Sequence, residues 1–358
     1  MDSQSLPLVS VVTPVYNCAE YLAECIESVL AQTYSNWDYT VVDNCSTDGS
    51  AEIARAYAAK DSRIRVIQNR QFLRAVANHN VALRQISSES KYCKVVFGDD
   101  WMFPHCLEEM VAIAEEHPSV GIVGAYGLDG NNILCAGLSY PSRIVSGREI
   151  CRRLFLEGTY VFGSSTSVLY RSALVRGQDH FYNEANLHAD REACLVLLKT
   201  RDFGFVHQIL TFMRVRPVSI GTMAEDVRMY LGCQLHTLVT HGPDFLTPVE
   251  LGGCLDELLA EYYNFLAVSL MRGRRDSKFW DLHKRKLTEG GVGFSRMRLS
   301  RAILARLCRA ALDPYETIEK LRGGRNRRVL AVSKRTDQVE SVPPPRFDET
   351  WAGGPVRE

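Results

Sequence analysis

The chain has 358 residues, of which 46% are hydrophobic and 23% are charged, which is typical of a globular protein. It contains no run of about 18 apolar residues, which argues against a membrane-spanning helix, and its acidic, polar start does not resemble a signal peptide. The 11 cysteines include no Cys-x-x-Cys pair, which argues against a disulfide scaffold or a zinc site and favours free thiols in a reducing cytoplasm.

The charge is balanced over the whole chain but is unevenly distributed along it. Residues 271–335 contain 19 basic and 6 acidic residues, a net charge of +13, and the remainder carries 23 basic and 36 acidic residues. Two interpretations stay open for the basic segment: solvated helix faces, or attraction to an anionic partner.

In chain order, the first hundred residues alternate between strand and helix patterns. Strands are predicted at 8–13, 39–42, 64–67 and 93–97, and helices at 51–60, 75–86 and after Asn17, where Asn17 and Glu20 form a capping-box pattern. Such alternation predicts an α/β fold, with a mainly parallel sheet flanked by helices.

The pattern changes along the rest of the chain. Further strands are predicted at 120–125, 166–170 and 203–207, and helices at 226–239, 250–271, 299–312 and 315–321. After Arg335 proline, glycine and charged residues dominate without periodicity. We therefore predict an α/β domain over 1–220, a basic helical region over 221–335 and a disordered tail over 336–358.

Polar residues follow three of the predicted strands: the stretch 14–17, Asp43 and the pair Asp99-Asp100. Ligands of open α/β sheets bind at the carboxyl ends of the strands, so these residues are expected to share one site. Carboxylates such as Asp99 and Asp100 suit a Mg²⁺ or Mn²⁺ ion that bridges nucleotide phosphates, although an Asp pair can also cap a turn. The sequence lacks the G-x-G-x-x-G, G-x-x-x-x-G-K-[ST] and G-x-S-x-G motifs.

Five stretches together resemble a known family. They are VSVVTPVYN (9–17), VVDNCSTDGS (41–50), GDDWMFP (98–104), HADREACLVLL (188–198) and FVHQILTFMR (205–214). In this order they resemble the motifs of inverting glycosyltransferases of family 2, which have the GT-A fold. The resemblance covers about residues 8–220 and implies transfer of a sugar from a nucleotide-sugar donor, with Mg²⁺ or Mn²⁺ as cofactor.

The resemblance also implies roles for residues of the donor site. Thr13, Pro14 and Tyr16 would surround the nucleotide base, and Asp43 would accept a hydrogen bond from a ring N–H of a uracil-type base. Asp99 matches the last Asp of the family's Asp-x-Asp motif, which binds the metal, and Asp100 either supplies a second carboxylate or positions the first.

The chain departs from the family pattern at four places. Asn44 and Cys45 follow Asp43 where the family usually has a second Asp and then Gly, which leaves Asp43 itself in place. Phe97 replaces the first Asp of the metal motif, and Ala189 replaces the Glu of the family's Glu-Asp base motif. His79 lies where relatives often carry an arginine, so it either takes the arginine's place beside base or phosphate or is an ordinary helix histidine. Asp190 is retained and is predicted to be the catalytic base that deprotonates the acceptor hydroxyl. Glu192 lies on roughly the opposite side of the same helix.

These features predict a metal-dependent transferase that uses a UDP-sugar and a glycan or lipid-linked acceptor. The alternative is a catalytically inactive scaffold or binding subunit, motivated by Phe97 and Ala189. Residues 299–311 form an apolar stripe flanked by arginines, which suits contact with an anionic membrane surface. We therefore expect a cytoplasmic protein at the inner face of the membrane; docking of this segment on the acidic body is the rival interpretation, and no nucleic-acid partner is expected.

Overall fold

A computed structural model describes residues 6–130, 132–178, 180–186, 188–214 and 229–312. Contacts between residues divide the chain into two compact units, Met1–Leu255 with Glu289–Gly291, and Asp256–Thr288 with Val292–Glu358. The first unit therefore extends beyond residue 220. The helix predicted at 315–321 and the tail predicted at 336–358 lie outside the described residues.

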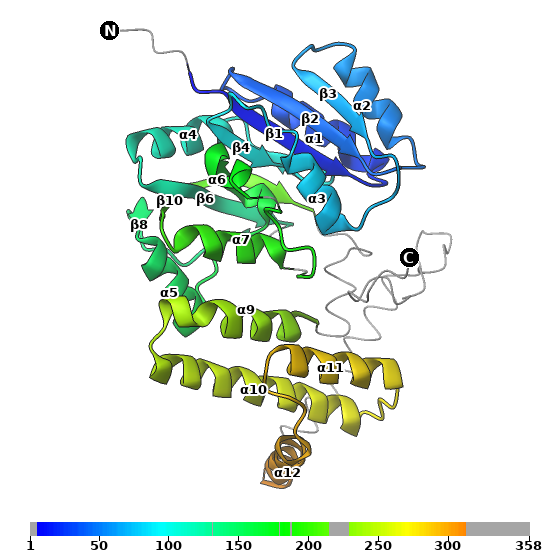
Figure 1. Cartoon of the computed structure of the whole chain (residues 1–358), viewed down its shortest axis with the longest axis vertical. Helices are drawn as coiled ribbons and strands as arrows, with labels where there is room; N and C mark the ends of the chain where they lie inside the picture. Colours follow the sequence, from blue (N-terminus) through cyan, green and yellow to red (C-terminus); the bar gives the residue numbers. More distant parts are fainter. Residues whose placement is uncertain (1–5, 131, 179, 187, 215–228, 313–358) are drawn as a thin grey trace. The chain divides into compact units, whose positions relative to one another are not determined.

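A ten-stranded sheet forms the centre of the first unit (Figure 1). Its main path has the order β3-β2-β1-β4-β9-β6-β10-β5, while β7 pairs with β6 and β8 with β10. The strands are β1 Val9–Val15, β2 Trp37–Asp43, β3 Ile64–Gln68, β4 Tyr92–Val95, β5 Trp101–Met102, β6 Val120–Asp129, β7 Asn132–Leu134, β8 Ile144–Val145, β9 Val168–Arg171 and β10 Asp202–Met213. Strands β3, β2, β1 and β4 are parallel, and β9 runs antiparallel to both of its neighbours, β4 and β6.

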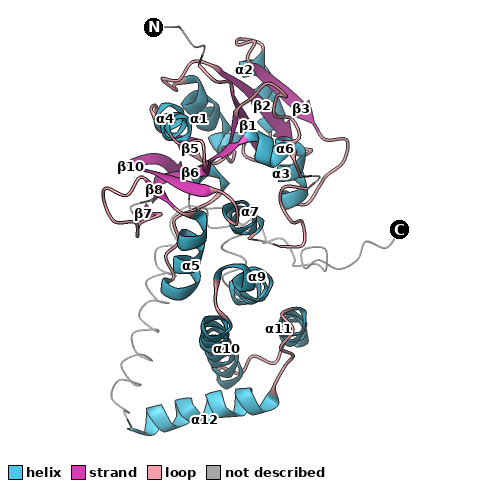
Figure 2. Cartoon of the chain, turned by 60° about the vertical axis from the view of Figure 1, so that its left-hand side comes forward, coloured by secondary structure: helices cyan, strands magenta, loops and turns pink. Residues whose placement is uncertain are grey.

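Helices cover both faces of this sheet (Figures 1 and 2). They are α1 Ala19–Leu30, α2 Ser50–Ala58, α3 Ala75–Leu83, α4 Cys106–Glu116, α5 Gly147–Glu157, α6 Ser172–Arg176 and α7 Ala189–Leu198; α9 Met229–Phe245 packs against α5 and α7. Because successive side chains of a strand point to opposite faces, Val11 packs in a core with α1 and α4, and Val12 packs in a second core with α3 and α7. Burial on both faces explains why these strands are continuously apolar.

The first four strands and three helices lie where the sequence predicts them, within a few residues. The predicted capping box is wrong. Asn17 has φ 49°, the N-cap of α1 is Cys18, and the Cys18 side chain forms no capping hydrogen bond. The first amides are bonded from another loop instead, since the Ala19 amide donates to Asp48 Oδ2 (2.9 Å) and the Cys18 amide to Ser50 Oγ (2.9 Å).

The second unit is helical. It contains the later part of α10 (Pro248–Met271), most of α11 (Ser277–Glu289) and α12 (Arg296–Leu312). Its core includes Tyr262, Phe279 and His283, and the Tyr262 hydroxyl lies 2.8 Å from His283 Nδ1. Among the described helices, none combines the length and the apolar character needed to cross a bilayer.

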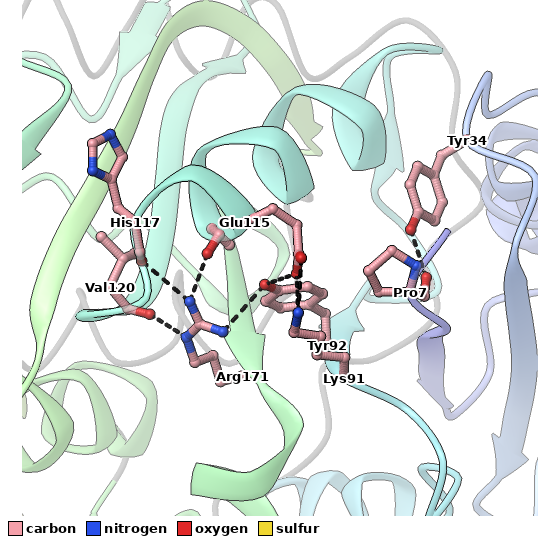
Figure 3. A network of polar contacts seen from close by, with 9 residues as sticks. Pro7, Tyr34, Lys91, Tyr92, Glu115, His117, Val120 and Arg171 are labelled. Carbon is pink, nitrogen blue, oxygen red and sulfur yellow. Dashed lines mark hydrogen bonds and ion pairs between the residues drawn. The ribbon is translucent and has the colours of Figure 1, made fainter. Parts of the chain in front are cut away.

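A polar network holds the amino ends of β4 and β6 together (Figure 3). Arg171, the last residue of β9, donates from Nη2 to the carbonyl oxygens of Ala114 (2.6 Å) and His117 (3.2 Å), which end helix α4. It also donates from Nε to the Val120 carbonyl and from Nη1 to the Tyr92 hydroxyl. One guanidinium therefore satisfies carbonyls that the end of a helix leaves unpaired.

We predict that Arg171→Met lowers the free energy of unfolding by about 2–3 kcal/mol, because it removes charged hydrogen bonds and leaves partly buried carbonyls unpaired. Lys91→Met is the matched control, since Lys91 forms an exposed ion pair with Glu115 at 2.7 Å and should cost less than about 1 kcal/mol. Urea unfolding of both variants measures the difference. Equal, small losses would show that the Arg171 network contributes little.

Candidate active site

The parallel registers bring the carboxyl ends of three strands to one edge of the sheet. Val15 at the end of β1 lies beside Asp43 at the end of β2, and Val12 of β1 lies beside Val95, the last residue of β4. The next residues of the chain, Phe97 to Asp100, therefore follow β4 at the same edge as Tyr16 and Asn44. The edge predicted from the sequence is the one that the structure forms.

Hydrogen bonds join the loop after β1 to the loop after β2. The Asn17 amide donates to Ser46 Oγ (3.0 Å), and the Thr47 amide donates to Asn17 Oδ1 (2.9 Å). Together with the bonds from Asp48 and Ser50 to the start of α1, they make the two loops one rigid rim. Such a rim is preorganised for a ligand that both loops contact.

Of the three residues predicted to surround a base, only Tyr16 presents an exposed side chain. Thr13 is fully buried, with Oγ1 2.8 Å from the Tyr39 hydroxyl, and Pro14 is buried in β1. Tyr16 is 47% exposed and its ring centroid lies 4.8 Å from that of Phe72, which is 51% exposed. Two exposed aromatic rings at the sheet edge offer a stacking surface for a planar ring. Phe72 was not predicted from the sequence.

Asp43 is fully buried at the end of β2. Both carboxylate oxygens lie 3.3 Å from the Ser46 amide, and the Asn69 amide donates to the Asp43 carbonyl at 2.9 Å. Asn44, the next residue, joins this loop to the loop before α3, because its side chain donates to the Leu73 carbonyl and accepts from the Leu73 amide. Asp43 thus braces the rim, and its contact with a base remains a prediction.

The acidic turn after β4 contains two carboxylates in different environments. Asp100 is 5% exposed; its Oδ2 accepts a hydrogen bond from Thr166 Oγ1 (2.7 Å) and its Oδ1 accepts one from the Arg214 amide (3.0 Å). Asp99 is partly exposed, and its carbonyl accepts from Arg214 Nε (3.2 Å). The structure therefore ties Asp100 to two neighbouring segments and presents Asp99 at the surface of the turn.

Within the described ranges no group of three or more His, Cys, Asp or Glu side chains is placed to hold a metal ion. A cation bound only by protein ligands is therefore not supported by these residues. A hard cation shared with a diphosphate needs just one or two carboxylates, because phosphate oxygens and water supply the other ligands. The partly exposed Asp99, with Asp100 beside it, fits this second arrangement.

His79 on α3 lies next to the acidic turn. Its ring stacks on Phe97 with centroids 4.8 Å apart, and its edge faces Tyr182 at 6.3 Å. Burial lowers the pKa of His79 to about 4, so the imidazole is neutral at pH 7. His79 does lie beside the site, but it does not supply the permanent positive charge of an arginine.

Asp190, in the first turn of α7, lies among tyrosines. Burial raises the pKa of its carboxyl group, and attraction to the neighbouring Arg191 opposes the shift only in part. Burial first, and the Asp190 charge in addition, also raise the pKa values of Tyr160 and Tyr182. Asp190 is nevertheless partly exposed, and its Oδ1 accepts a hydrogen bond from the Arg191 amide (2.8 Å). A desolvated, accessible carboxylate is suited to act as a general base.

The strand predicted at 166–170 begins only at Val168, and the turn before it joins the acidic turn to the surroundings of Asp190. In the 3₁₀ helix η1 (Ser165–Ser167), Thr166 contacts Asp100, and Ser165 Oγ accepts a hydrogen bond from the Tyr182 hydroxyl (2.9 Å). Tyr182 in turn lies beside His79 and senses the charge of Asp190, so a chain of contacts links the acidic turn to both residues. Asp43 and Tyr16 lie along the same edge, and the side chain of Thr13 points into the core.

Glu192, two residues after Asp190, faces a different helix. It is 8% exposed and accepts hydrogen bonds from Asn183 (3.0 Å), Asn186 (2.9 Å) and His241 of α9 (3.0 Å). Burial favours the neutral form, but these bonds and His236 outweigh it and lower the pKa of Glu192 below its usual range. Glu192 is therefore an ionised anchor for α9.

We predict that Asp190→Asn leaves the melting temperature at pH 7 unchanged or raises it. The raised folded-state pKa means that the ionised carboxylate opposes folding above the unfolded-state pKa, and an amide removes that cost.

Glu192→Gln is the matched control on the same helix. Its lowered pKa contributes stability that is present above the unfolded pKa and lost as the pH falls, so this variant should lose about 2 kcal/mol at pH 7. Thermal unfolding measures both. A melting temperature that falls as far in Asp190→Asn as in Glu192→Gln would contradict the assignment of Asp190 as a site residue.

Comparisons with known proteins identify the family. A family model described as "Glycosyl transferase family 2" matches residues 10–175. The chain is 31% identical over 229 residues to the glycosyltransferase GlyG of Streptococcus pneumoniae, covering 62% of this chain and 75% of GlyG. The chain therefore belongs to glycosyl transferase family 2, and the family predicted from the motifs is confirmed.

A second relative is EpsE of Bacillus subtilis, to which glycosyltransferase activity is ascribed. It is 39% identical over 153 residues, which cover 40% of this chain and 54% of EpsE. The chain thus spans about half the length of that relative.

Solved structures show the same fold. S. aureus TarS 1–349 in complex with UDP-GlcNAc has a TM-score of 0.58 at 18% identity, covering 89% of this chain and 92% of that one. The mannosyltransferase PcManGT from Pyrobaculum calidifontis, in complex with GDP-Man and Mn²⁺, has a TM-score of 0.51 at 15% identity, covering 89% and 84%. At these identities the likeness concerns the fold alone, and the predicted α/β fold is confirmed.

Proposed function

We propose that the chain is an inverting glycosyltransferase that moves a sugar from a nucleotide-sugar donor, a UDP-sugar, to a hydroxyl group of a glycan or lipid-linked acceptor. The observation that carries the proposal is Asp190, a desolvated but accessible carboxylate that a short turn connects to the acidic turn after β4. Family membership and the nucleotide-sugars named in the TarS and PcManGT complexes support it.

The described residues suggest how the reaction proceeds. Asp190 accepts the proton of the acceptor hydroxyl while that oxygen attacks the anomeric carbon and the nucleoside diphosphate leaves. One carboxylate suffices, because an inverting displacement forms no covalent bond to the enzyme. The raised pKa of Asp190 makes it a stronger base than an ordinary Asp, and it stays ionised only above that raised pKa.

The donor would lie along the rim formed by the loops after β1, β2 and β4. The exposed Tyr16 and Phe72 rings would stack on the base, with Asp43 below it, and Asp99 with Asp100 would hold Mg²⁺ or Mn²⁺. When bound, the ion would neutralise negative charge on the departing diphosphate. Asp100 would contribute mainly by fixing the turn, since both of its oxygens already accept hydrogen bonds.

We predict that Asp190→Asn lowers kcat at least about 10³-fold with little change in donor KM, since it removes only the proton acceptor. Asp99→Ala should lower kcat/KM and abolish the response of the rate to Mn²⁺.

The wild-type rate should rise with pH up to the raised pKa of Asp190, above the range of an ordinary Asp.

A screen of purified protein against UDP-sugars and hydroxyl acceptors, with Mg²⁺ and Mn²⁺, measures these effects. Wild-type rates in Asp190→Asn would refute the mechanism. A folded wild-type protein that binds nucleotide-sugars but neither transfers nor hydrolyses them would favour the inactive binding subunit instead.

We further propose that helix α12 contacts the anionic inner face of a membrane. The helix has five arginines and no acidic residue, and Met297, Leu304, Leu307 and Leu312 are 50–85% exposed. Its other apolar side packs within the second unit, where Leu299 and Ile303 line a groove with Trp280. Among the described residues Arg296, Arg301 and Arg309 form no ion pair, so their charges are available to anionic headgroups as far as the described acidic side chains are concerned.

Vesicle sedimentation tests this contact. We predict that the full chain binds vesicles containing phosphatidylglycerol but not phosphatidylcholine alone, that high salt weakens binding, and that Leu304→Glu weakens it about tenfold. Ile133→Glu is the control, because Ile133 is 59% exposed in the first unit. Unchanged sedimentation of Leu304→Glu, or self-association through α12 without vesicle binding, would overturn the proposal.

A further inference from the structure

Lys94 is a lysine buried in strand β4. Its side chain is fully inaccessible, and it forms no ion pair with the described part of the chain. The ammonium donates to the carbonyl oxygens of Thr166 (2.6 Å) and Val168 (3.2 Å), and the sulfur atom of Met110 lies 3.8 Å away. Burial opposes the charged form and lowers the pKa of Lys94 below its usual range, and attraction to nearby groups, Asp100 among them, opposes this shift only in part. The proposed reaction does not use this side chain directly.

The two carbonyls lie where the β4–β9 ladder ends. Lys94 and Leu169 form the last pair of that ladder, and the turn η1 directly precedes β9 at this end. Past the last backbone pair, the Lys94 ammonium therefore supplies the hydrogen bonds between the two segments. It holds the turn against the end of β4, which leads directly into the acidic turn.

The turn η1 also fixes the Asp99-Asp100 pair. Thr166 Oγ1 accepts a hydrogen bond from the Phe97 amide (3.2 Å) and donates one to Asp100 Oδ2 (2.7 Å). The adjacent Ser165 accepts from Tyr182, whose hydroxyl pKa is raised mainly by burial and also by the charge of Asp190. A displacement of η1 would thus alter both the donor side and the acceptor side of the site.

We propose that Lys94 is a positioning residue for the donor site: by holding η1 through the carbonyls of Thr166 and Val168, it fixes the orientation of the Asp99-Asp100 turn. This inference rests on the proposed function, because it assigns Lys94 to the binding of the donor's diphosphate. Lys94 itself touches neither donor nor acceptor. Its effect passes through Thr166, so substitutions at the two positions should affect the acidic turn in the same way and should not be additive.

Binding of UDP in the presence of Mn²⁺, measured by titration calorimetry on the full chain, tests the inference separately from turnover. We expect Lys94→Met and Thr166→Val each to weaken UDP binding about tenfold, because each loses a charged hydrogen bond that orders the turn. Thr166→Ser keeps the hydroxyl and should stay within about twofold of the wild type. The double variant Lys94→Met/Thr166→Val should bind no more weakly than the weaker single variant, since the two act through one path.

Lys91→Met is the matched control, because Lys91 precedes the same strand but forms an exposed ion pair. A Lys94→Met variant with a lowered melting temperature and unchanged UDP affinity would show a purely structural role, and additive losses in the double variant would also overturn the inference. If Lys94→Met does not fold, equal affinities of Thr166→Val and Thr166→Ser would overturn it. A wild-type chain that binds no UDP would contradict the donor assignment as well, whereas normal binding by both wild type and Lys94→Met contradicts the role of Lys94 alone.

Discussion

The antiparallel direction of β9 is the constraint on which the site depends. Because β9 runs opposite to β4 and β6, it begins at the edge where β4 and β6 end. The turn η1 that precedes it is therefore delivered to the acidic turn, where Thr166 contacts Asp100. A parallel strand at this place in the sheet would bring only its end to that edge. Strand β10, parallel to β6, ends at the same edge and adds the Arg214 amide on the other side of Asp100.

The polar groups at one edge of the sheet stabilise the fold, and those at the opposite edge form the candidate site. At the amino ends of β4 and β6, Arg171 satisfies the last carbonyls of α4 and the Tyr92 hydroxyl, so the cation is fully engaged in holding the fold. At the carboxyl ends, the Asp190 carboxyl group is desolvated although its Oδ1 accepts the Arg191 amide, an arrangement that costs stability. The free-energy cost of a desolvated carboxylate at one edge is offset because the other edge and the two apolar cores stabilise the sheet.

The sequence sufficed for the parts of the fold that repeat a local pattern. Periodic apolar residues located the first four strands, and polar residues directly after them located Asp43 and the Asp99-Asp100 pair at the correct edge. Contacts between distant segments could not be predicted in this way. The Asn17 side chain turns to the Thr47 amide instead of capping α1, and Thr166 reaches Asp100 across 66 residues. Such partners depend on which strands become neighbours, which the local sequence does not encode.

Phe97 and His79 form one uncharged contact beside the acidic turn. Their rings stack at 4.8 Å, in a place buried enough to lower the pKa of His79 to about 4. A carboxylate at position 97 would lie against a neutral ring, and an arginine at position 79 would lie against an apolar one. Burial disfavours the charged form of a side chain, so a charge at either position would be desolvated. Because this corner carries no charge at pH 7, the diphosphate and any bound cation of the proposed reaction would depend more strongly on the orientation of Asp99.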